Sequence, residues 1–214
     1  AKKLLKRHRT SDLEALRAAW EDLHLQYLAT GHESGCTASI ALIVEEKIYV
    51  LNCGDSKVLV TSKGHVEGEE REAVYFATKD HSPSDPNEIG RIEKLGGIVE
   101  CSISGTPKVR VPVENDESWL LGLSRCVGGK DWRNSGILPI PDITSFCLEN
   151  IHDNVIVASD GIWEVMDEDA CANFVHSLRN DGKSATEAAI MLSREAGLRG
   201  SADNITAVVA YLDS

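Results

Sequence analysis

Three aspartates lie where a predicted strand meets a turn, which places carboxylates where they can gather. Asp160 directly follows the apolar run at 155–159, and Asp203 stands just ahead of the apolar run at 205–212. If these two strands are antiparallel neighbours, the end of one and the start of the other share a sheet edge. Both carboxylates then meet at that edge. Asp55, in the turn Gly-Asp-Ser, also follows a predicted strand.

Converging carboxylates repel one another unless a cation lies between them, and oxygen-only ligand sets suit Mg²⁺ or Mn²⁺. Two such ions about 3.5–4 Å apart can lower the pKa of a bridging water and hold a phosphoryl group for in-line attack. The alternative is structural, because Asp-Gly and Gly-Asp-Ser are common turn sequences in which Asp bonds its own backbone. Only the joint placement of Asp55, Asp160 and Asp203 favours a metal centre over three unrelated turns.

Helical and strand patterns surround these aspartates. Apolar residues at a 3-4-3-4 spacing, Leu13, Leu16, Trp20, Leu23 and Tyr27, predict a helix that begins with a capping box and ends at Gly31. Strands are expected at 37–44, 47–53 and 57–61 as a meander, at 155–159 and at 205–212. Further helices are expected at 88–95, 168–179 and 185–197, whereas the polar stretch at 62–76 is typical of a loop. We therefore predict one α+β domain over 1–214, with strand-rich layers and outer helices, and with 1–33 as a helical lead-in.

The composition of the 214-residue chain excludes several classes of protein. With 22 Lys and Arg against 34 Asp and Glu, the net charge is −12, which argues against general nucleic-acid binding. Hydrophobic residues make up 42% and charged residues 26%, an ordinary globular balance. The longest aliphatic run, at 40–44, is far too short to span a bilayer. The chain also begins with Ala-Lys-Lys, so we expect it to be part of a longer protein.

The six cysteines form no C-x-x-C pair and have no zinc-ribbon spacing. Several lie inside apolar runs, which favours buried free thiols over disulfides. The sequence thus predicts a reducing intracellular compartment, cytoplasmic or nuclear. His81, which follows an aspartate, is expected to form hydrogen bonds within its loop, with a role in the site left open.

Taken in order, six motifs resemble the protein phosphatase 2C family of metal-dependent Ser/Thr phosphatases. They are S-G-C-T-A at 34–38, N-C-G-D-S-K at 52–57, D-H-S-P with the later E, R-I and G-G-I-V at 80–99, L-S-R with G at 123–128, A-S-D-G-I-W-E-V at 158–165 and S-A-D-N-I-T at 201–206. The resemblance implies a sandwich of two antiparallel β-sheets flanked by α-helices, a four-layer αββα fold.

The resemblance also implies roles for single residues. Asp160 and Asp203 match ligands of a centre that holds two Mg²⁺ or Mn²⁺ ions, and Asp55 matches a carboxylate tied to a weaker third metal. Ser159 and Asn204 would support the ligands from behind. The implied reaction is hydrolysis of phosphoserine or phosphothreonine in a phosphoprotein, with a regulatory protein as a possible further partner.

The sequence departs from the family pattern in four respects. It has no D-G-H-G-G segment, which in the family supplies a bridging Asp, a carbonyl ligand and a general-acid His, and it has no matching phosphate-binding Arg. We expect the chain to begin just after that segment. Gly129 also stands where the family has Asp, and Lys57 where it has Arg.

Two hypotheses of different classes follow. The first is a metal-dependent Ser/Thr phosphatase whose front segment lies outside these 214 residues. The second is a catalytically inactive phosphatase-like domain that binds or regulates other proteins. For the 214 residues alone we expect little or no turnover, because without the bridging Asp no water is correctly held between two cations.

Overall fold

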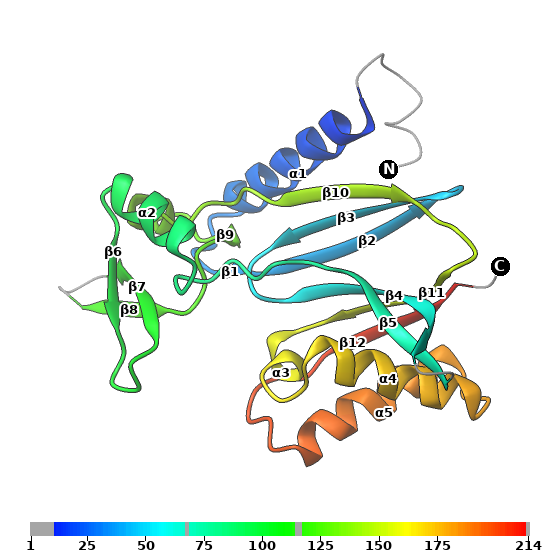
Figure 1. The fold of residues 1–214 in the computed structure, drawn as a ribbon. Coiled ribbons are helices and arrows are strands. Elements are labelled where there is room, and N and C mark those ends of the chain that lie inside the picture. Colours follow the sequence, from blue (N-terminus) through cyan, green and yellow to red (C-terminus); the bar gives the residue numbers. More distant parts are fainter. Residues whose placement is uncertain (1–10, 67–68, 114–116, 213–214) are drawn as a thin grey trace. The chain divides into compact units, whose positions relative to one another are not determined.

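The computed structural model describes residues 11–66, 69–113 and 117–212 (Figure 1). Two compact units divide the chain, and each is built from two separate segments. Unit 1 contains the described residues of Ala1–Ala38 and His81–Ile143, and unit 2 those of Ser39–Asp80 and Thr144–Ser214. The single domain over 1–214 stays a prediction, and residues 1–10 of its helical lead-in lie outside the described residues.

Two sheets form most of unit 2. The first has the order β12-β11-β4-β5, with bounds β12 (Ala207–Tyr211), β11 (His152–Ala158), β4 (Lys57–Val66) and β5 (Glu69–Ala77). Every neighbouring pair in this sheet is antiparallel. The second has the order β10-β3-β2, with bounds β10 (Asp142–Cys147), β3 (Lys47–Cys53) and β2 (Ala38–Val44).

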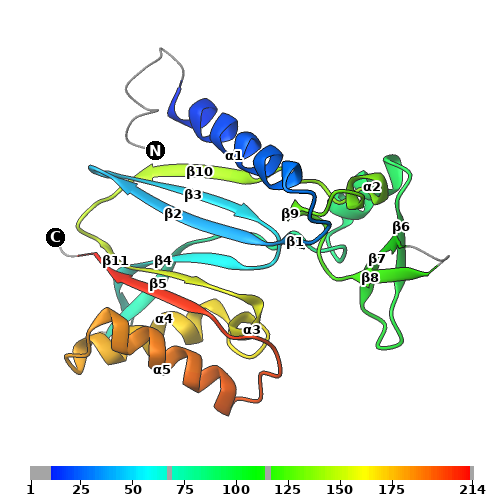
Figure 2. The same ribbon diagram turned by 180° about the vertical axis from the view of Figure 1, so that it is seen from behind.

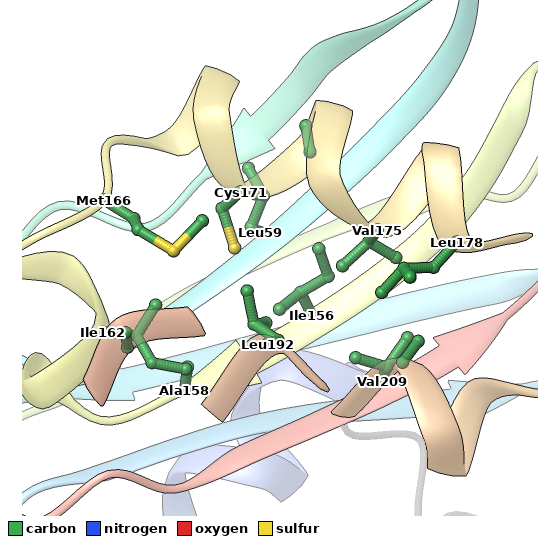
Figure 3. Close-up of a cluster of buried hydrophobic side chains, with 13 residues drawn as sticks. Leu59, Ile156, Ala158, Ile162, Met166, Cys171, Val175, Leu178, Leu192 and Val209 are labelled. Carbon is green, nitrogen blue, oxygen red and sulfur yellow. The ribbon is translucent and has the colours of Figure 1, made fainter. Parts of the chain in front are cut away.

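In the central strands of the first sheet, successive apolar side chains point to opposite faces, so both faces of the sheet are apolar. Val58 and Val155 belong to a buried cluster that also contains Ile48 from the second sheet, so the two sheets face one another. Leu59 and Ile156 point the other way. They meet the helices α4 (Glu168–Asn180) and α5 (Ala185–Leu198), which cover that face (Figures 2 and 3). Unit 2 therefore has three layers, and the predicted α+β class with antiparallel sheets is confirmed.

The predicted meander of β2, β3 and β4 is wrong in its last step. β2 and β3 are joined as expected through Glu45-Glu46, but β4 belongs to the opposite sheet. Asn52 explains the crossover, because its buried side-chain amide donates to the carbonyls of Gly54 and Lys79 at 3.2 and 3.1 Å. These bonds fix the turn that carries the chain from one sheet to the other.

The predicted loop at 62–76 is also wrong. β4 continues to Val66, and β5 pairs with it in antiparallel register, for example Lys63 with Glu72. The stretch looks like a loop in sequence because its residues are polar. Strand β5, however, lies at the sheet edge, where charged residues are common, and its pairing comes from backbone groups.

Unit 1 combines helices with small sheets. Its elements are α1 (Asp12–Ala29), β1 (Gly35–Cys36), α2 (Pro86–Lys94), β6 (Ile98–Cys101), β7 (Pro107–Pro112), β8 (Ser118–Leu121), β9 (Val127–Gly128) and a 3₁₀ helix, η2 (Trp132–Ser135). Strands β6, β7 and β8 form an antiparallel sheet, and β1 pairs with β9. The core of the unit consists of Ile92, Val109, Val111, Cys126 and Ile137.

The capping boxes predicted from sequence are present. Ser11 and Glu14 cap α1 reciprocally, and Ser184 and Glu187 do the same for α5. Among the described residues, no helix has both the length and the apolar character needed to cross a membrane.

The buried stripe of α1 differs from the predicted apolar face. Leu23, expected to be buried, is 49% exposed, whereas Trp20 and His24 are buried. Trp20 donates from Nε1 to the carbonyl of Pro139 at 2.9 Å, and His24 accepts at Nδ1 from the backbone N–H of Gly128 at 3.1 Å. These polar contacts determine which face of α1 is buried, and the spacing of apolar residues in the sequence does not reveal them.

A buried carboxylate organises the polar interior of unit 1. Glu88 is 4% exposed and accepts hydrogen bonds from Arg91, Arg125 and the hydroxyl of Ser124. Burial alone raises the pKa of Glu88, but the three donors outweigh it and lower the pKa to about 2. His81 lies in the same unit, with Nε2 3.2 Å from Oδ2 of Asp142, the first residue of β10. Hydrogen bonds of the His81 side chain within its own loop stay a prediction.

All six cysteines are unpaired, but only half are buried as predicted. Cys53, Cys126 and Cys171 are buried, whereas Cys36, Cys101 and Cys147 are exposed. Burial raises the pKa of both Cys126 and Cys171 to about 12, so these two thiols stay protonated at neutral pH.

Replacing Glu88 with glutamine should destabilise unit 1, because two partly buried guanidinium groups lose their counter-charge. The expected loss is about 3 kcal/mol in the free energy of unfolding, measured by urea denaturation followed by circular dichroism. Glu100→Gln is the matched control, since it removes the surface ion pair with Arg110 and should cost far less. Equal losses in the two variants would contradict the role given to Glu88.

The same carboxylate predicts an acid dependence. Because the pKa of Glu88 falls from 4.5 to about 2 on folding, its contribution is complete above pH 4.5 and is lost as the pH falls towards 2. The stability of Glu88→Gln should therefore fall less steeply than that of the unmodified chain between pH 4.5 and 2.

Candidate metal centre

The strands that flank the two central aspartates are neighbours. β11 and β12 pair in antiparallel register, with Ala158 opposite Ala207. Asp160 follows the end of β11, and Asp203 precedes the start of β12. The geometry expected from sequence is thus confirmed, since both carboxylates lie at the same end of the sheet in unit 2.

Three carboxylates gather at this end. Asp160, Glu164 and Asp203 each offer an oxygen atom, and these atoms all lie within 4.8 Å of one another. Asp160 is half-buried, whereas Glu164 and Asp203 are exposed. We call this group the carboxylate cluster.

Sequence reasoning missed Glu164. Asp160 begins the single-turn helix α3 (Asp160–Trp163), and Glu164 is its C-cap residue. A separation of four residues places two side chains on the same face of a helical turn. The signal was therefore present in the run Asp-Gly-Ile-Trp-Glu, but it becomes visible only once that run is known to be helical.

Ser159 ties the two sides of the carboxylate cluster together. Its hydroxyl donates to the carbonyl of Asn204 at 3.0 Å and accepts from the backbone N–H of Thr206 at 3.1 Å. A backbone bond from Ser159 to the carbonyl of Thr206, at 3.0 Å, completes the junction. Ser159 thus joins the segments that carry Asp160 and Asp203, and Asn204 takes part through its backbone carbonyl. The supporting role of these two residues at a metal site stays a prediction.

Gly161 permits a close approach between the two sides of the carboxylate cluster. A Cβ atom at this position would lie 2.6 Å from the carbonyl oxygen of Asn204, well inside van der Waals contact. Only glycine lets the start of α3 come so near the loop that carries Asp203.

Each aspartate also uses an oxygen to fix its own turn. Asp160 accepts from the N–H of Gly161 at 3.0 Å, and Asp203 accepts from the N–H of Asn204 at 2.6 Å, both through Oδ1. The structural interpretation of these residues as turn formers is therefore also correct. It does not compete with metal binding, because a carboxylate has further lone pairs to offer.

Asp55 is not a member of the carboxylate cluster. It lies in the turn between β3 and β4, two residues before Lys57, which pairs with Ala158. Asp55 thus belongs to the same end of the sheet as Asp160. Among the described residues, however, the group that meets the distance criterion contains only Asp160, Glu164 and Asp203. The role of Asp55 at a weaker third metal stays a prediction.

The donor set of the carboxylate cluster fits a hard divalent cation. It consists of oxygen atoms alone, carries three formal negative charges and is open to solvent on two of its members. These properties match Mg²⁺ and Mn²⁺ better than Zn²⁺, whose protein sites favour nitrogen and sulfur.

Gly129, one of the departures noted in the sequence, has a local structural cause within unit 1. Its φ is +61°, and a Cβ atom there would lie 2.5 Å from the Trp132 ring. A side chain at 129 would therefore need both a left-handed backbone and a displaced tryptophan. The packing of Trp132 occupies the space that an aspartate would need.

Comparison with known proteins now assigns the chain to a family. The family model described as Protein phosphatase 2C matches residues 3–205. The chain therefore belongs to the protein phosphatase 2C family, as the motifs predicted.

Curated relatives agree with this assignment. The chain is 32% identical over 167 residues to "Probable protein phosphatase 2C 21" of Arabidopsis thaliana, covering 73% of this chain and 41% of the relative. It is 29% identical over 192 residues to the human "Integrin-linked kinase-associated serine/threonine phosphatase 2C", covering 84% of this chain and 45% of the relative. The chain thus spans about half the length of the curated relatives it matches.

Solved structures share the fold. A serine-threonine phosphatase 2C from Toxoplasma gondii superposes with a TM-score of 0.77 at 23% identity, covering 99% of this chain and 74% of that one. A sex-determining protein of C. elegans superposes with a TM-score of 0.74 at 26% identity, covering 98% of this chain and 49% of that one.

The close contact at Gly161 makes a direct prediction. Gly161→Ala should push the Asn204 carbonyl away and separate Asp160 from Asp203, lowering stability by about 1–3 kcal/mol and weakening Mn²⁺ binding. Thermal unfolding and calorimetric titration with Mn²⁺ measure the two effects.

Gly90→Ala is the matched control, because it lies in α2 and its Cβ would meet no atom within 4 Å. This helix substitution should raise stability by about 0.5–1 kcal/mol. Unchanged metal binding in Gly161→Ala would show that the contact with Asn204 does not set the cluster geometry.

Proposed function

We propose that the complete protein is a metal-dependent protein serine/threonine phosphatase that hydrolyses phosphoserine and phosphothreonine in phosphoproteins. One observation carries the proposal: three carboxylates converge at the ends of β11 and β12 in a chain of the protein phosphatase 2C family. Hydrolysis of a phosphate ester needs positive charge near the phosphoryl group, and a carboxylate cluster is how a protein gathers such charge.

In this proposal Asp160, Glu164 and Asp203 hold Mg²⁺ or Mn²⁺. Two ions per site, with a weaker third near Asp55, is the arrangement we propose from the family resemblance. When bound, such ions supply an activated water and neutralise developing negative charge on the phosphoryl oxygens.

The chain's own residues would hold and expose the site. Ser159 and Gly161 keep the two ligand-bearing segments at a fixed separation, so the carboxylates need little reorganisation to bind a cation. The exposure of Glu164 and Asp203 leaves the cluster accessible at the surface. A phosphorylated side chain on a large protein substrate can reach only such an open site.

A second candidate is a catalytically inactive phosphatase-like domain that binds or regulates a protein partner. It is favoured by Gly129, which replaces a family aspartate and whose Cβ position is filled by the Trp132 ring. Loss of a carboxylate reduces the negative charge available to a metal centre. The two candidates differ in turnover, not in fold.

We also propose a reducing intracellular compartment, cytoplasmic or nuclear. The support is chemical: six cysteines are unpaired, and three of them are exposed. Exposed thiols of this kind persist where the surroundings are kept reducing.

Metal binding can be tested on the chain directly. Calorimetric titration with Mn²⁺ should show binding that Asp160→Asn weakens at least tenfold, since even the outer partners of a metal site typically contribute about 10–100-fold to affinity. Asp181→Asn is the control, because this exposed aspartate caps the far end of α4 and should leave affinity unchanged. Equal binding by both variants would remove Asp160 from the metal centre.

Catalysis is tested on the protein expressed from its complete coding sequence. Release of inorganic phosphate from a phosphothreonine peptide should require Mn²⁺ or Mg²⁺, stop on addition of EDTA and be abolished by Asp160→Ala. Turnover that survives EDTA and the substitution would contradict the metal assignment. Metal binding without any turnover would favour the inactive binding domain.

A further inference from the structure

Lys57 is a buried cation beside the carboxylate cluster. It is the first residue of β4 and is 8% exposed. Its Nζ forms a hydrogen-bonded ion pair with Oε1 of Glu168 and lies 3.4 Å from Oδ1 of Asp80. It also lies 5.4 Å from the centroid of the Trp163 ring, within the range of a cation–π contact. A buried charge needs partners of this kind, since unpaired burial is costly.

The partners of Lys57 belong to the elements that carry the cluster. Trp163 is the last residue of α3, whose first residue is Asp160 and whose C-cap is Glu164. Nε1 of Trp163 donates to the carbonyl of Ala158 at 2.9 Å, and Ala158 pairs with Lys57 across β11 and β4. The Lys57 ammonium group contacts the Trp163 ring, and the indole N–H of Trp163 is bonded to β11, so both contacts hold the helical turn α3.

Glu168 extends this arrangement to the next helix. It is the first residue of α4, and the hydrogen bond from Lys57 lowers the pKa of its carboxyl group, so this carboxylate is ionised at neutral pH. Lys57 therefore joins the start of β4, the turn α3 and the N-terminus of α4.

A helix of a single turn depends on such outside contacts. Forming one turn fixes several backbone dihedrals for few hydrogen bonds, so α3 cannot hold its shape alone. We propose that Lys57 is a positioning residue of the metal centre, which holds the turn carrying Asp160 and Glu164 through Trp163 and Glu168. This inference rests on the proposed function, because it assumes that the carboxylate cluster binds a divalent cation.

The direction in which metal affinity changes on removal of Lys57 separates a positioning role from a purely electrostatic one. A cation near a metal site repels the metal, so removing Lys57 should strengthen metal binding if charge alone matters. Removal also takes one positive charge away from Asp80 and Glu168, which adds to the attraction for the metal. Weaker binding after removal can therefore come only from loss of geometry.

The experiment is calorimetric titration of Mn²⁺ into three variants of the chain. Lys57→Met keeps most of the side-chain stem and removes the charge, and it should weaken Mn²⁺ binding about tenfold. The double variant Lys57→Met with Glu168→Gln removes the ion pair without changing net charge, and it should weaken binding to a similar degree. Lys57→Arg keeps the cation over Trp163 and should stay within about threefold of the unmodified chain.

Lys63→Met is the matched control. Lys63 lies on the same strand and pairs with Asp153 at 3.6 Å, near the first residue of β11 and so at the opposite end of that strand from Asp160. The substitution Lys63→Met removes one positive charge, as Lys57→Met does, and should leave Mn²⁺ affinity unchanged. Thermal unfolding of each metal-free variant shows whether it is folded.

The results distinguish a failure of the positioning role of Lys57 from a failure of the proposed function. Mn²⁺ binding by Lys57→Met as tight as that of the unmodified chain, or tighter, would overturn the positioning role. Absence of Mn²⁺ binding in the unmodified protein expressed from its complete coding sequence would overturn the proposed function instead. Should Lys57→Met fail to fold, Glu168→Gln and Trp163→Phe provide the test, and unchanged affinity in both would equally overturn the proposal.

Discussion

The register between β11 and β12 is the constraint on which the carboxylate cluster depends. Ile156 lies opposite Val209, and both belong to the core beneath α4 and α5. Val155 lies opposite Ala210, and both belong to the core between the sheets. A slip of one residue would exchange these faces and bury the wrong side chains. The apolar interior therefore fixes, at a distance, where Asp160 and Asp203 meet.

Fine adjustment of the cluster comes from polar contacts rather than from the core. On one side, Ser159 bonds both to the Asn204 carbonyl and to the Thr206 backbone, and Gly161 lets these segments approach. On the other side, Lys57 braces the short helix α3. The two sets of contacts have different effects: the first sets the distance between Asp160 and Asp203, and the second sets the orientation of the turn α3.

Sequence pattern predicted the longer helices, the central strands and the β2–β3 and β11–β12 neighbours, but not the remaining strand pairing. The helix predicted at 185–197 agrees with α5 to within one residue. The agreement is close because the capping box and the apolar spacing are both local signals. The crossover at Asn52 was missed, since a buried amide that bonds to a distant carbonyl leaves no periodic trace. β5 was missed because backbone pairing allows a polar edge strand. Asp160 and Asp203 could be paired from strand ends alone, whereas Glu164 required knowledge of the helical turn.

The most direct test of the metal centre is a crystal structure of the chain grown with Mn²⁺, with anomalous data collected at the manganese absorption edge. The carboxylate cluster predicts an anomalous peak within coordination distance of Asp160, Glu164 and Asp203. Occupied manganese positions elsewhere, with none at these three residues, would contradict the assignment of this sheet end as the metal centre.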